Sequence, residues 1–241
     1  MIELLNVNKS YNGKTKVVDN LELTIKDGEI FGFIGPNGAG KTTTIKMITG
    51  ILNPDSGSIK INGINMADKP LQCKKEFAFV PDSPDMFLRL KGLEYLNFMG
   101  DIYQVPKEAR REKIKTLSER FEMDIALSDQ LQSYSHGMRQ KIIIMGALLH
   151  DPSVWILDEP MTGLDPKASF LLKEMMREHA QNGKTVFFST HVLEVAEKLC
   201  DRVAIINKGR LLFCGTIKDM RVHFKAKESL EEMFLEMVDN E

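Results

Sequence analysis

The first third of the chain contains short apolar or alternating runs separated by turn residues. Alternation of apolar and polar positions is typical of a strand with one buried face, and Asn-Gly or Asp-Gly pairs mark turns between strands. Such pairs stand at Asn12-Gly13, Asp27-Gly28 and Asn62-Gly63. The pattern predicts strands at residues 2–8, 17–25, 29–34, 57–62 and 77–81.

Between residues 91 and 149 the pattern becomes helical. Pro106 suits the first turn of a helix, and residues 107–121 are rich in helix formers. Beyond residue 150, strands alternate with helices, which is typical of a parallel sheet with crossover helices. The predicted strands are Val154–Leu157, Thr185–Ser189 and Arg202–Ile206, and the predicted helices are Pro166–Ala180 and Val192–Leu199.

The end of the chain, residues 226–240, places four apolar residues on one face of a helix: Leu230, Met233, Phe234 and Met237. We expect this helix to dock on its own domain rather than on a partner, because an apolar stripe on a surface helix usually faces its own core.

Composition narrows the class of protein. A chain of 241 residues suits one sizeable α/β domain, or a core with an inserted lobe. The 32 basic and 34 acidic residues nearly balance, which gives no support for nucleic acid as a partner. The 3 cysteines form no CxxC pair and suit reduced thiols in the cytoplasm. No signal peptide and no membrane-spanning stretch is visible, so work at a membrane would need another subunit to span it.

The strongest motif is Gly35-Pro36-Asn37-Gly38-Ala39-Gly40-Lys41-Thr42, which matches the phosphate loop G-x-x-x-x-G-K-[ST]. It follows an apolar strand and opens a helix, which is the context this loop requires. Its glycines let backbone N–H groups approach the phosphates of ATP, helped by the helix N-terminus. Lys41 would reach the β- and γ-phosphates, Thr42 would bind Mg²⁺, and Thr43 completes the predicted nucleotide-binding set.

Two acids follow the apolar strand Val154–Leu157. Asp158 would hold Mg²⁺, and Glu159 would orient or deprotonate the attacking water. Alone, this pair could be any strand end that meets a solvated loop, but a phosphate loop upstream favours the functional interpretation. His191 follows another apolar strand, in Ser189-Thr190-His191, and we expect it at the same sheet edge. A single histidine is usually structural, so His191 is a catalytic candidate only because the phosphate loop and the two acids are present as well.

Between these motifs lies Tyr134-Ser135-His136-Gly137-Met138-Arg139-Gln140-Lys141. It resembles the signature motif of ABC ATPases, commonly Leu-Ser-Gly-Gly-Gln, and a Tyr-Ser-x-Gly-Met variant found in one exporter branch of multidrug, sodium and antibiotic exporters. Residues 162–166 resemble the family's D-loop. Tyr11 stands where the family places an aromatic residue on adenine, and Asp82 stands in its Q-loop. The resemblance extends from about residue 2 to residue 215, so it covers nearly the whole chain.

The resemblance implies a single ABC ATPase domain over residues 1–241. It would contain a phosphate-loop core with a mostly parallel sheet, a small antiparallel β subdomain, a helical subdomain at roughly 83–150 and a helical tail at roughly 217–241. It also implies a head-to-tail pair of ATPase subunits, in which Ser135 and Gly137 of one close over ATP bound by the other. The partners would be a second ATPase subunit, identical or different, and a separate membrane permease on the inner face of the cell membrane.

Two departures from the family pattern bear on activity. His136 replaces the first signature glycine, so close backbone approach must come from Gly137. Asp82 replaces the usual Q-loop glutamine. We interpret this aspartate, a candidate for catalysis and for Mg²⁺, as a marker of the exporter lineage and not of a dead enzyme, because Lys41 and the other catalytic candidates are present. The alternative for Tyr11 is an ordinary packing aromatic.

Rival functions from other classes stay open. A soluble ABC ATPase acting on ribosomes or DNA is disfavoured by the single cassette, the absence of a heptad insert and the lack of basic surplus. An importer subunit is disfavoured by the signature variant and Asp82. Residues 81–89 would dock the permease through Met86, Phe87 and Leu88, and the alternative is that these three residues pack inside the helical lobe. The transported substrate is not specified.

Overall fold

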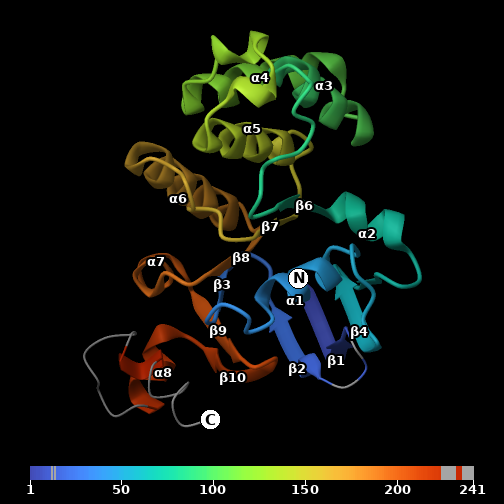
Figure 1. Ribbon diagram of the computed structural model, residues 1–241, viewed down its shortest axis with the longest axis vertical. Helices are drawn as coiled ribbons and strands as arrows, with labels where there is room; N and C mark the ends of the chain where they lie inside the picture. Colours follow the sequence, from blue (N-terminus) through green and yellow to red (C-terminus); the bar gives the residue numbers. More distant parts are fainter. Residues whose placement is uncertain (12, 14, 224–231, 235–241) are drawn as a thin grey trace.

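The computed structural model describes residues 1–11, 13, 15–223 and 232–234, whose strands form two sheets (Figure 1). The smaller sheet is antiparallel, with 4 strands in the order β2-β1-β4-β5. Its strands are β1 (Ile2–Ser10), β2 (Lys16–Ile25), β4 (Ser56–Ile61) and β5 (Ile64–Asn65). Asn62 and Gly63 both have positive φ, 50° and 76°, which suits the tight turn between β4 and β5 that the Asn-Gly pair predicts.

The alternation in β1 is interrupted by a bulge. Ile2, Leu4 and Val7 are buried, so the spacing of buried residues changes from two to three. The pairing with β2 shifts between Leu4 and Val7, and Asn6 there has a φ of 52°. One extra residue thus keeps Val7 on the inner face, against the buried side chains of helix α1 (Lys41–Ile48).

The larger sheet has 6 strands in the order β10-β9-β3-β8-β7-β6. All neighbours are parallel except β10, which is antiparallel to β9. Every residue of β3, β7 and β8 is buried, which suits the apolar sequences of β3 and β7. β8 is apolar at its centre and has the buried polar residues Thr185, Ser189 and Thr190 at its ends. The strands are β3 (Ile30–Ile34), β6 (Phe77–Val80), β7 (Val154–Leu157), β8 (Thr185–Thr190), β9 (Arg202–Asn207) and β10 (Arg210–Gly215).

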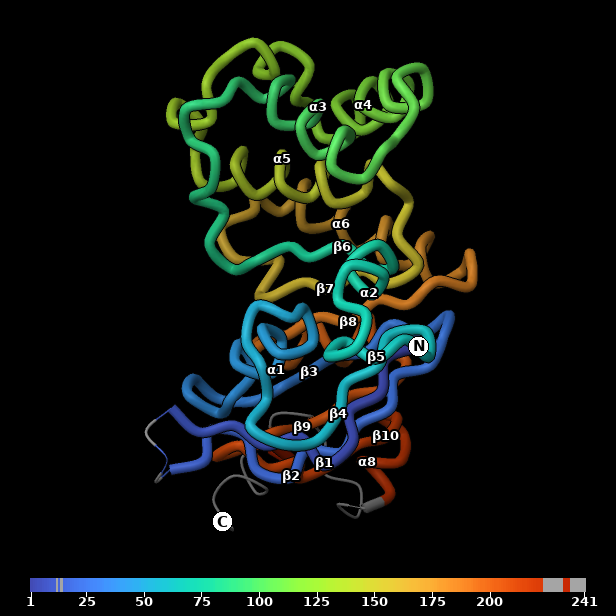
Figure 2. Tube along the Cα trace, turned by 90° about the vertical axis from the view of Figure 1, so that its right-hand side faces the viewer, coloured from blue at the N-terminus to red at the C-terminus, as the bar shows by residue number. Residues whose placement is uncertain are grey.

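Three helices form a separate lobe: α3 (Gly92–Ile102), α4 (Lys107–Phe121) and α5 (His136–Leu148). Figures 1 and 2, two views at right angles, place this lobe at one end of the molecule and β1, β2 and β4 toward the other. Pro106 lies directly before α4, at its N-cap. Two 3-10 turns, Ala126–Ser128 and Leu131–Ser133, precede α5, so the predicted helical stretch is broken into pieces.

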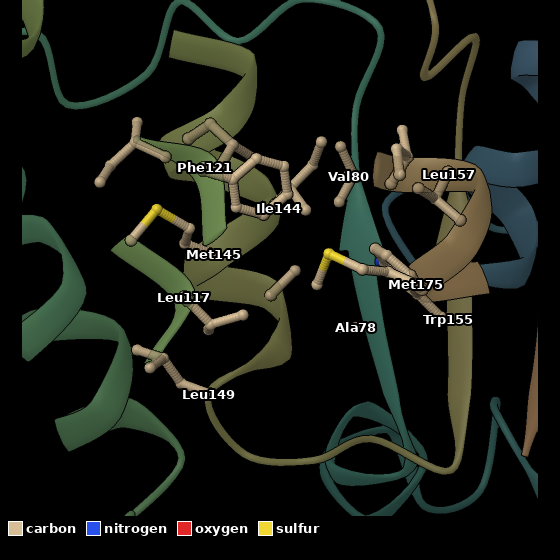
Figure 3. Close-up of a cluster of buried hydrophobic side chains, with 14 of the residues drawn as sticks. Ala78, Val80, Leu117, Phe121, Ile144, Met145, Leu149, Trp155, Leu157 and Met175 are labelled. Carbon is tan, nitrogen blue, oxygen red and sulfur yellow. The ribbon is translucent and has the colours of Figure 1, made fainter. Parts of the chain in front are cut away.

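One hydrophobic cluster joins the helical lobe to the sheet. Figure 3 shows side chains from α4, α5, β6, β7 and α6 (Pro166–Gln181) meeting in it, among them Phe121, Ile144, Val80, Leu157 and Met175. Each Å² of apolar surface that this packing removes from water stabilises the junction by roughly 25 cal/mol. The lobe is therefore held to the edge strand β6 by packing as well as by chain connections.

Three elements were missing from the prediction: α2 (Pro70–Glu76), β5 and β10. α8 (Ile217–His223) lies at the start of the helical tail that the resemblance implies at roughly 217–241. The remaining helix, α7 (Leu193–Leu199), matches the predicted one to within a residue. Of the predicted C-terminal stripe, Met233 is fully buried and Phe234 packs on the same cluster, which includes Met220 of α8, so these two residues face their own domain. Leu230 and Met237, like Asn12 of the first predicted turn, lie outside the described residues. No helix in the described ranges is long and apolar enough to cross a bilayer.

Candidate functional site: a phosphate loop beside an acidic sheet edge

The phosphate loop connects β3 to α1, and its glycines are required by its geometry. Gly38 and Gly40 have φ of 80° and 107°, a region that side chains rarely adopt. A Cβ on Gly35 would lie 2.4 Å from the carbonyl oxygen of Ile206, and one on Gly40 would lie 2.7 Å from that of Val17. At these two positions the loop can therefore pass this close to its neighbours only with glycine.

Lys41 is the first residue of α1, and it is nearly buried at the loop. Its Nζ donates to the carbonyl of Gly35 at 2.7 Å and lies 3.6 Å from Oε1 of Glu159. Lys41 is 7% exposed and Glu159 is 15% exposed, so water screens this ion pair only in part. The lysine is thus positioned between the loop that would hold phosphates and the acid that would act on water.

The predicted acids stand at the end of β7, at the same sheet edge. Asp158 is 2% exposed, and its Oδ1 accepts a hydrogen bond from Ser189 at 2.5 Å. Burial raises the pKa of Asp158, the nearby Asp82 and Glu159 add to this rise, and hydrogen bonds from Ser189 and Thr42 oppose it. A divalent cation at this carboxylate would favour its ionised form.

Glu159 is held at both ends. Its backbone has a φ of 48°, an uncommon value outside glycine, and its N–H donates to Oγ of Ser189 at 3.0 Å. Its Oε2 lies 2.9 Å from Nδ1 of His191, which follows β8. One carboxylate oxygen thus faces Lys41 and the other faces His191. The structure brings Lys41, Asp158, Glu159 and His191 together, as the sequence predicts.

A polar cavity of about 220 Å³ opens above the loop. Tyr11 is at its margin, where its hydroxyl lies 3.3 Å from Oγ1 of Thr43 and most of its ring is exposed. A larger cavity of about 440 Å³ lies between α4 and α6 and contains none of the predicted site residues. The lining of the polar cavity comprises Val17, Pro36, Asn37, Gly38, Gly40, Lys41, Thr42, Thr43, Asp82 and Glu159.

The oxygen donors at this edge fit Mg²⁺. Among the described residues no cluster of three or more His, Cys, Asp or Glu side chains could hold a metal by itself. Mg²⁺ is usually bound by one or two carboxylates with substrate phosphates and water, so a complete protein cage is not expected. Asp158, Thr42 and Asp82 supply hard oxygen ligands of the required kind beside the phosphate loop.

The signature residues lie elsewhere on the molecule. Ser135 is the exposed N-cap of α5, where its Oγ accepts a hydrogen bond from the N–H of Met138 at 3.3 Å. None of the residues that line the polar cavity belongs to α5 (Figure 1). Ser135 and Gly137 are therefore not brought to the phosphate loop of their own chain.

His136, which replaces a signature glycine, is accommodated by the D-loop. A Cβ on Gly163 would lie 2.2 Å from Cδ2 of His136, and Gly163 has a φ of 75°. A Cβ on Gly137 would lie 2.9 Å from the carbonyl oxygen of Gly163. Nζ of Lys141 lies 3.4 Å from Oδ2 of Asp165. The two motifs thus pack on each other within one chain, a contact that the separate motifs did not reveal.

The segment 81–90 contains no helix or strand. Met86 and Phe87 are exposed, and Phe87 contacts the rings of Tyr95 and Phe98 with centroid separations of 5.7 and 5.4 Å. Asp85 of this segment pairs at 2.6 Å with Arg139, on the first turns of α5. The segment therefore presents apolar surface and is tied to the signature helix.

Fold and loop together define a phosphate-loop nucleotide-binding protein. A model of the ABC transporter family matches residues 18–162, and the chain belongs to this family of ATP-binding subunits. It is 36% identical over 239 residues to the ABC-type transporter ATP-binding protein EcsA of Bacillus subtilis, covering 98% of this chain and 97% of that one.

Two further similarities agree with this assignment. The chain is 37% identical to the Nod factor export ATP-binding protein I of Burkholderia orbicola, over 89% of this chain and 70% of that one. The solved structure of an ATP binding subunit of an ABC transporter superimposes with a TM-score of 0.94 at 34% identity, covering 98% of this chain and 99% of that one.

Proposed function

We propose that this chain is the ATP-hydrolysing motor subunit of an ABC exporter that drives a separate membrane permease. The observation that carries the proposal is the meeting of Lys41, Asp158, Glu159 and His191 at one sheet edge beside the phosphate loop. Residues 35–43 would bind the phosphates of ATP, and Tyr11 would support the adenine at the cavity margin.

In this proposal Glu159 is the general base. A carboxylate that takes the proton of an attacking water contributes about 10²–10⁴-fold in rate. Glu159 is paired with Lys41, whose Nζ the β- and γ-phosphates would also attract. Binding of ATP would therefore draw Lys41 toward phosphate and leave Glu159 held by His191 and by its own backbone.

Thr42, Asp158 and Asp82 would hold Mg²⁺, which neutralises phosphate charge when it is bound. Asp82 lines the polar cavity and interacts electrostatically with Asp158. Its carboxylate would favour a cation where glutamine would offer a neutral amide. This placement supports an active role for Asp82 and is consistent with a lineage-specific replacement.

The exposed signature supports a head-to-tail pair of subunits. Ser135 begins α5 with its side chain accessible, and a helix N-terminus favours an anion. We propose that Ser135 and Gly137 of one subunit complete the phosphate loop of a second copy of this chain. Each nucleotide would then be enclosed by two half-sites from different chains.

Export and the permease partner are supported by three observations. The signature has the Tyr-Ser-x-Gly-Met form, Asp82 replaces glutamine, and a relative of 37% identity is named for export. The segment 81–89, in which Met86 and Phe87 are exposed, would receive the permease and thereby hold the chain at the inner face of the membrane. We propose residues 1–241 as one ABC domain, with a helical lobe at 83–150 and a tail at 217–241.

The test uses the wild-type protein and Glu159→Gln. The wild type is expected to hydrolyse ATP in Mg²⁺, and Glu159→Gln to bind ATP with similar affinity while turnover falls by about 10²–10⁴-fold. The substituted protein should then accumulate as a nucleotide-bound dimer in size-exclusion chromatography with light scattering. Hydrolysis by Glu159→Gln within a few-fold of wild type would contradict the assignment of the base.

A further inference from the structure

One buried hydroxyl connects the two acids of the site. Ser189 is completely buried in β8, which lies between β3 and β7 in the sheet (Figure 1). Its Oγ donates to Oδ1 of Asp158 at 2.5 Å and accepts from the N–H of Glu159 at 3.0 Å. A serine hydroxyl has one donor and two acceptor positions, so a single side chain can make both contacts.

The contact to Glu159 holds an unusual backbone. Immediately after β7 the chain turns into the left-handed region at Glu159, with a φ of 48°. A residue other than glycine persists there only where the surroundings impose it. The N–H of Glu159 has its partner in Ser189, and its carbonyl accepts from the N–H of Thr162 at 3.1 Å. Ser189 thus secures one end of the turn that aims the Glu159 side chain.

The end of β8 therefore holds Glu159 at two points. Ser189 holds the main chain, and His191, two residues later, contacts the carboxylate at 2.9 Å. Ser189 is not among the residues that line the polar cavity, and no part of it is accessible to a nucleotide. An effect of Ser189 on the reaction must therefore pass through Asp158 or Glu159.

We propose that Ser189 is a positioning residue that sets the orientation of Glu159 for attack by water. The inference rests on the proposed ATPase function. It predicts a loss in kcat with little change in KM, because Thr42 still donates to Asp158 and the loop that would bind phosphate is untouched. A misplaced catalytic group can reduce a rate by about 10²-fold. We expect Ser189→Ala to lower kcat by roughly 10–100-fold and to change KM for ATP by less than about threefold.

Two conservative variants distinguish positioning from general damage. Ser189→Thr keeps a hydroxyl on a strand residue and should restore kcat to within about fivefold of wild type. Ser189→Cys keeps the size of the side chain but has a weak donor and acceptor, so its kcat should lie between those of the Ala and Thr variants. The cysteine variant also serves as the test if Ser189→Ala does not fold.

Ser153 offers a matched control at the opposite end of β7. Its Oγ donates to the carbonyl of Glu76 at 2.7 Å and to Oε2 of Glu76 at 3.2 Å, and it accepts from Nδ2 of Asn62 at 2.8 Å, so it also both donates and accepts. Ser153→Ala should lower the melting temperature and leave kcat within about twofold of wild type, because the lost bonds are remote from the acids.

The decisive experiment measures ATP hydrolysis by wild type and Ser189→Ala, each with and without Glu159→Gln. If Ser189 acts through Glu159, its removal should change the residual rate of the Glu159→Gln protein by less than about twofold, since coupled residues are not additive. An unchanged kcat in Ser189→Ala, or the same fall in both backgrounds, would overturn the inference. A wild type that binds ATP without hydrolysing it would overturn the proposed function, and this inference with it.

Discussion

Two helix N-termini carry the two halves of the proposed site, and they are built differently. α1 begins after Gly40, a left-handed residue with no side chain to cap the helix, and its first residue, Lys41, is buried. α5 begins after Ser135, which caps the N–H of Met138 and is exposed. Both ends favour an anion. The N-terminus of α1 lies beside the polar cavity, and the N-terminus of α5 lies on the exposed surface of the helical lobe.

Under the proposed function, this difference explains why one chain would not form a complete site. Backbone N–H groups of the phosphate loop have no capping side chain to compete with a ligand, and the acids of β7 and the histidine after β8 stand beside them. The signature has a serine hydroxyl, whose hydrogen is available to donate, but no acid of its own at the helix start. In the proposed pair its chemistry would depend on a partner surface, which the α1 half of a second copy would supply.

The largest effect is expected when a bulky side chain replaces Ser135 at the exposed N-terminus of α5. Ser135→Arg should retain ATP binding, because α1 is unaltered, but lose ATP-dependent dimerisation and at least about 100-fold in hydrolysis, the scale of a lost donor to transition-state charge. Light scattering and an ATPase assay would measure both effects.

Ser128→Arg provides the matched control, because Ser128 is also exposed in the helical lobe, on a 3-10 turn. It should be close to wild type in both assays. Mixing Ser135→Arg with Lys41→Ala should restore at most one of two composite sites. Full activity of monomeric Ser135→Arg would rule out the paired arrangement.

The next largest effect is expected at the segment beside the signature helix, where we propose that the permease binds. Phe87→Ala should leave ATP binding by the isolated subunit unchanged and weaken association with the cognate permease by about 1–3 kcal/mol, the range of an aromatic anchor at an interface. Pull-down and ATPase assays with the permease in lipid would measure this.

Ile125→Ala is the control for Phe87→Ala, because Ile125 is 91% exposed and lies outside the segment 81–90. It should bind the permease normally. If Phe87→Ala associates normally, or if the isolated subunit fails to fold, Phe87 is a packing residue of the lobe and the docking surface lies elsewhere.

The smallest effect concerns the contact between signature and D-loop. Gly163→Ala forces the ring of His136 away, because the new Cβ would occupy its place. It also places alanine at a φ of 75°, and we expect a loss of stability of about 1–2 kcal/mol from this strain. Hydrolysis should fall on the order of tenfold, because the displaced ring belongs to the signature.

Gly183→Ala separates the effect of backbone strain from the effect of displacing the His136 ring. Gly183 has a φ of 77° with open space where a Cβ would lie, so its substitution should cost similar stability and leave hydrolysis unchanged. Adding His136→Gly to Gly163→Ala should recover activity but not stability. Equal activity losses in the two glycine variants, compared by thermal melting and ATPase assays, would show that His136 has no part in the effect.

The sequence by itself determined the local features of both halves. The Asn-Gly turn, the apolar strands and the phosphate loop follow from periodicity and from backbone requirements that a few adjacent residues express. The break between helical and strand patterns near residue 150 likewise separates the lobe from the core. Elements such as α2 and β10 were missed because they bury few residues and therefore show little apolar periodicity: Cys73 is the one buried residue of α2, and β10 has none.

Only the tertiary structure decided which of these features meet. Strand order places β8 between β3 and β7, which makes Ser189 the link between Asp158 and Glu159. The start of α5 meets the loop before α6, which opposes Gly163 to His136. The position of the lobe leaves Ser135 outside the pocket. These contacts join residues 27 or more positions apart, such as His136 and Gly163, and no local pattern specifies them. They arise because burial of apolar strands and helices selects one arrangement of the whole chain, and the polar residues at the element ends are carried with it.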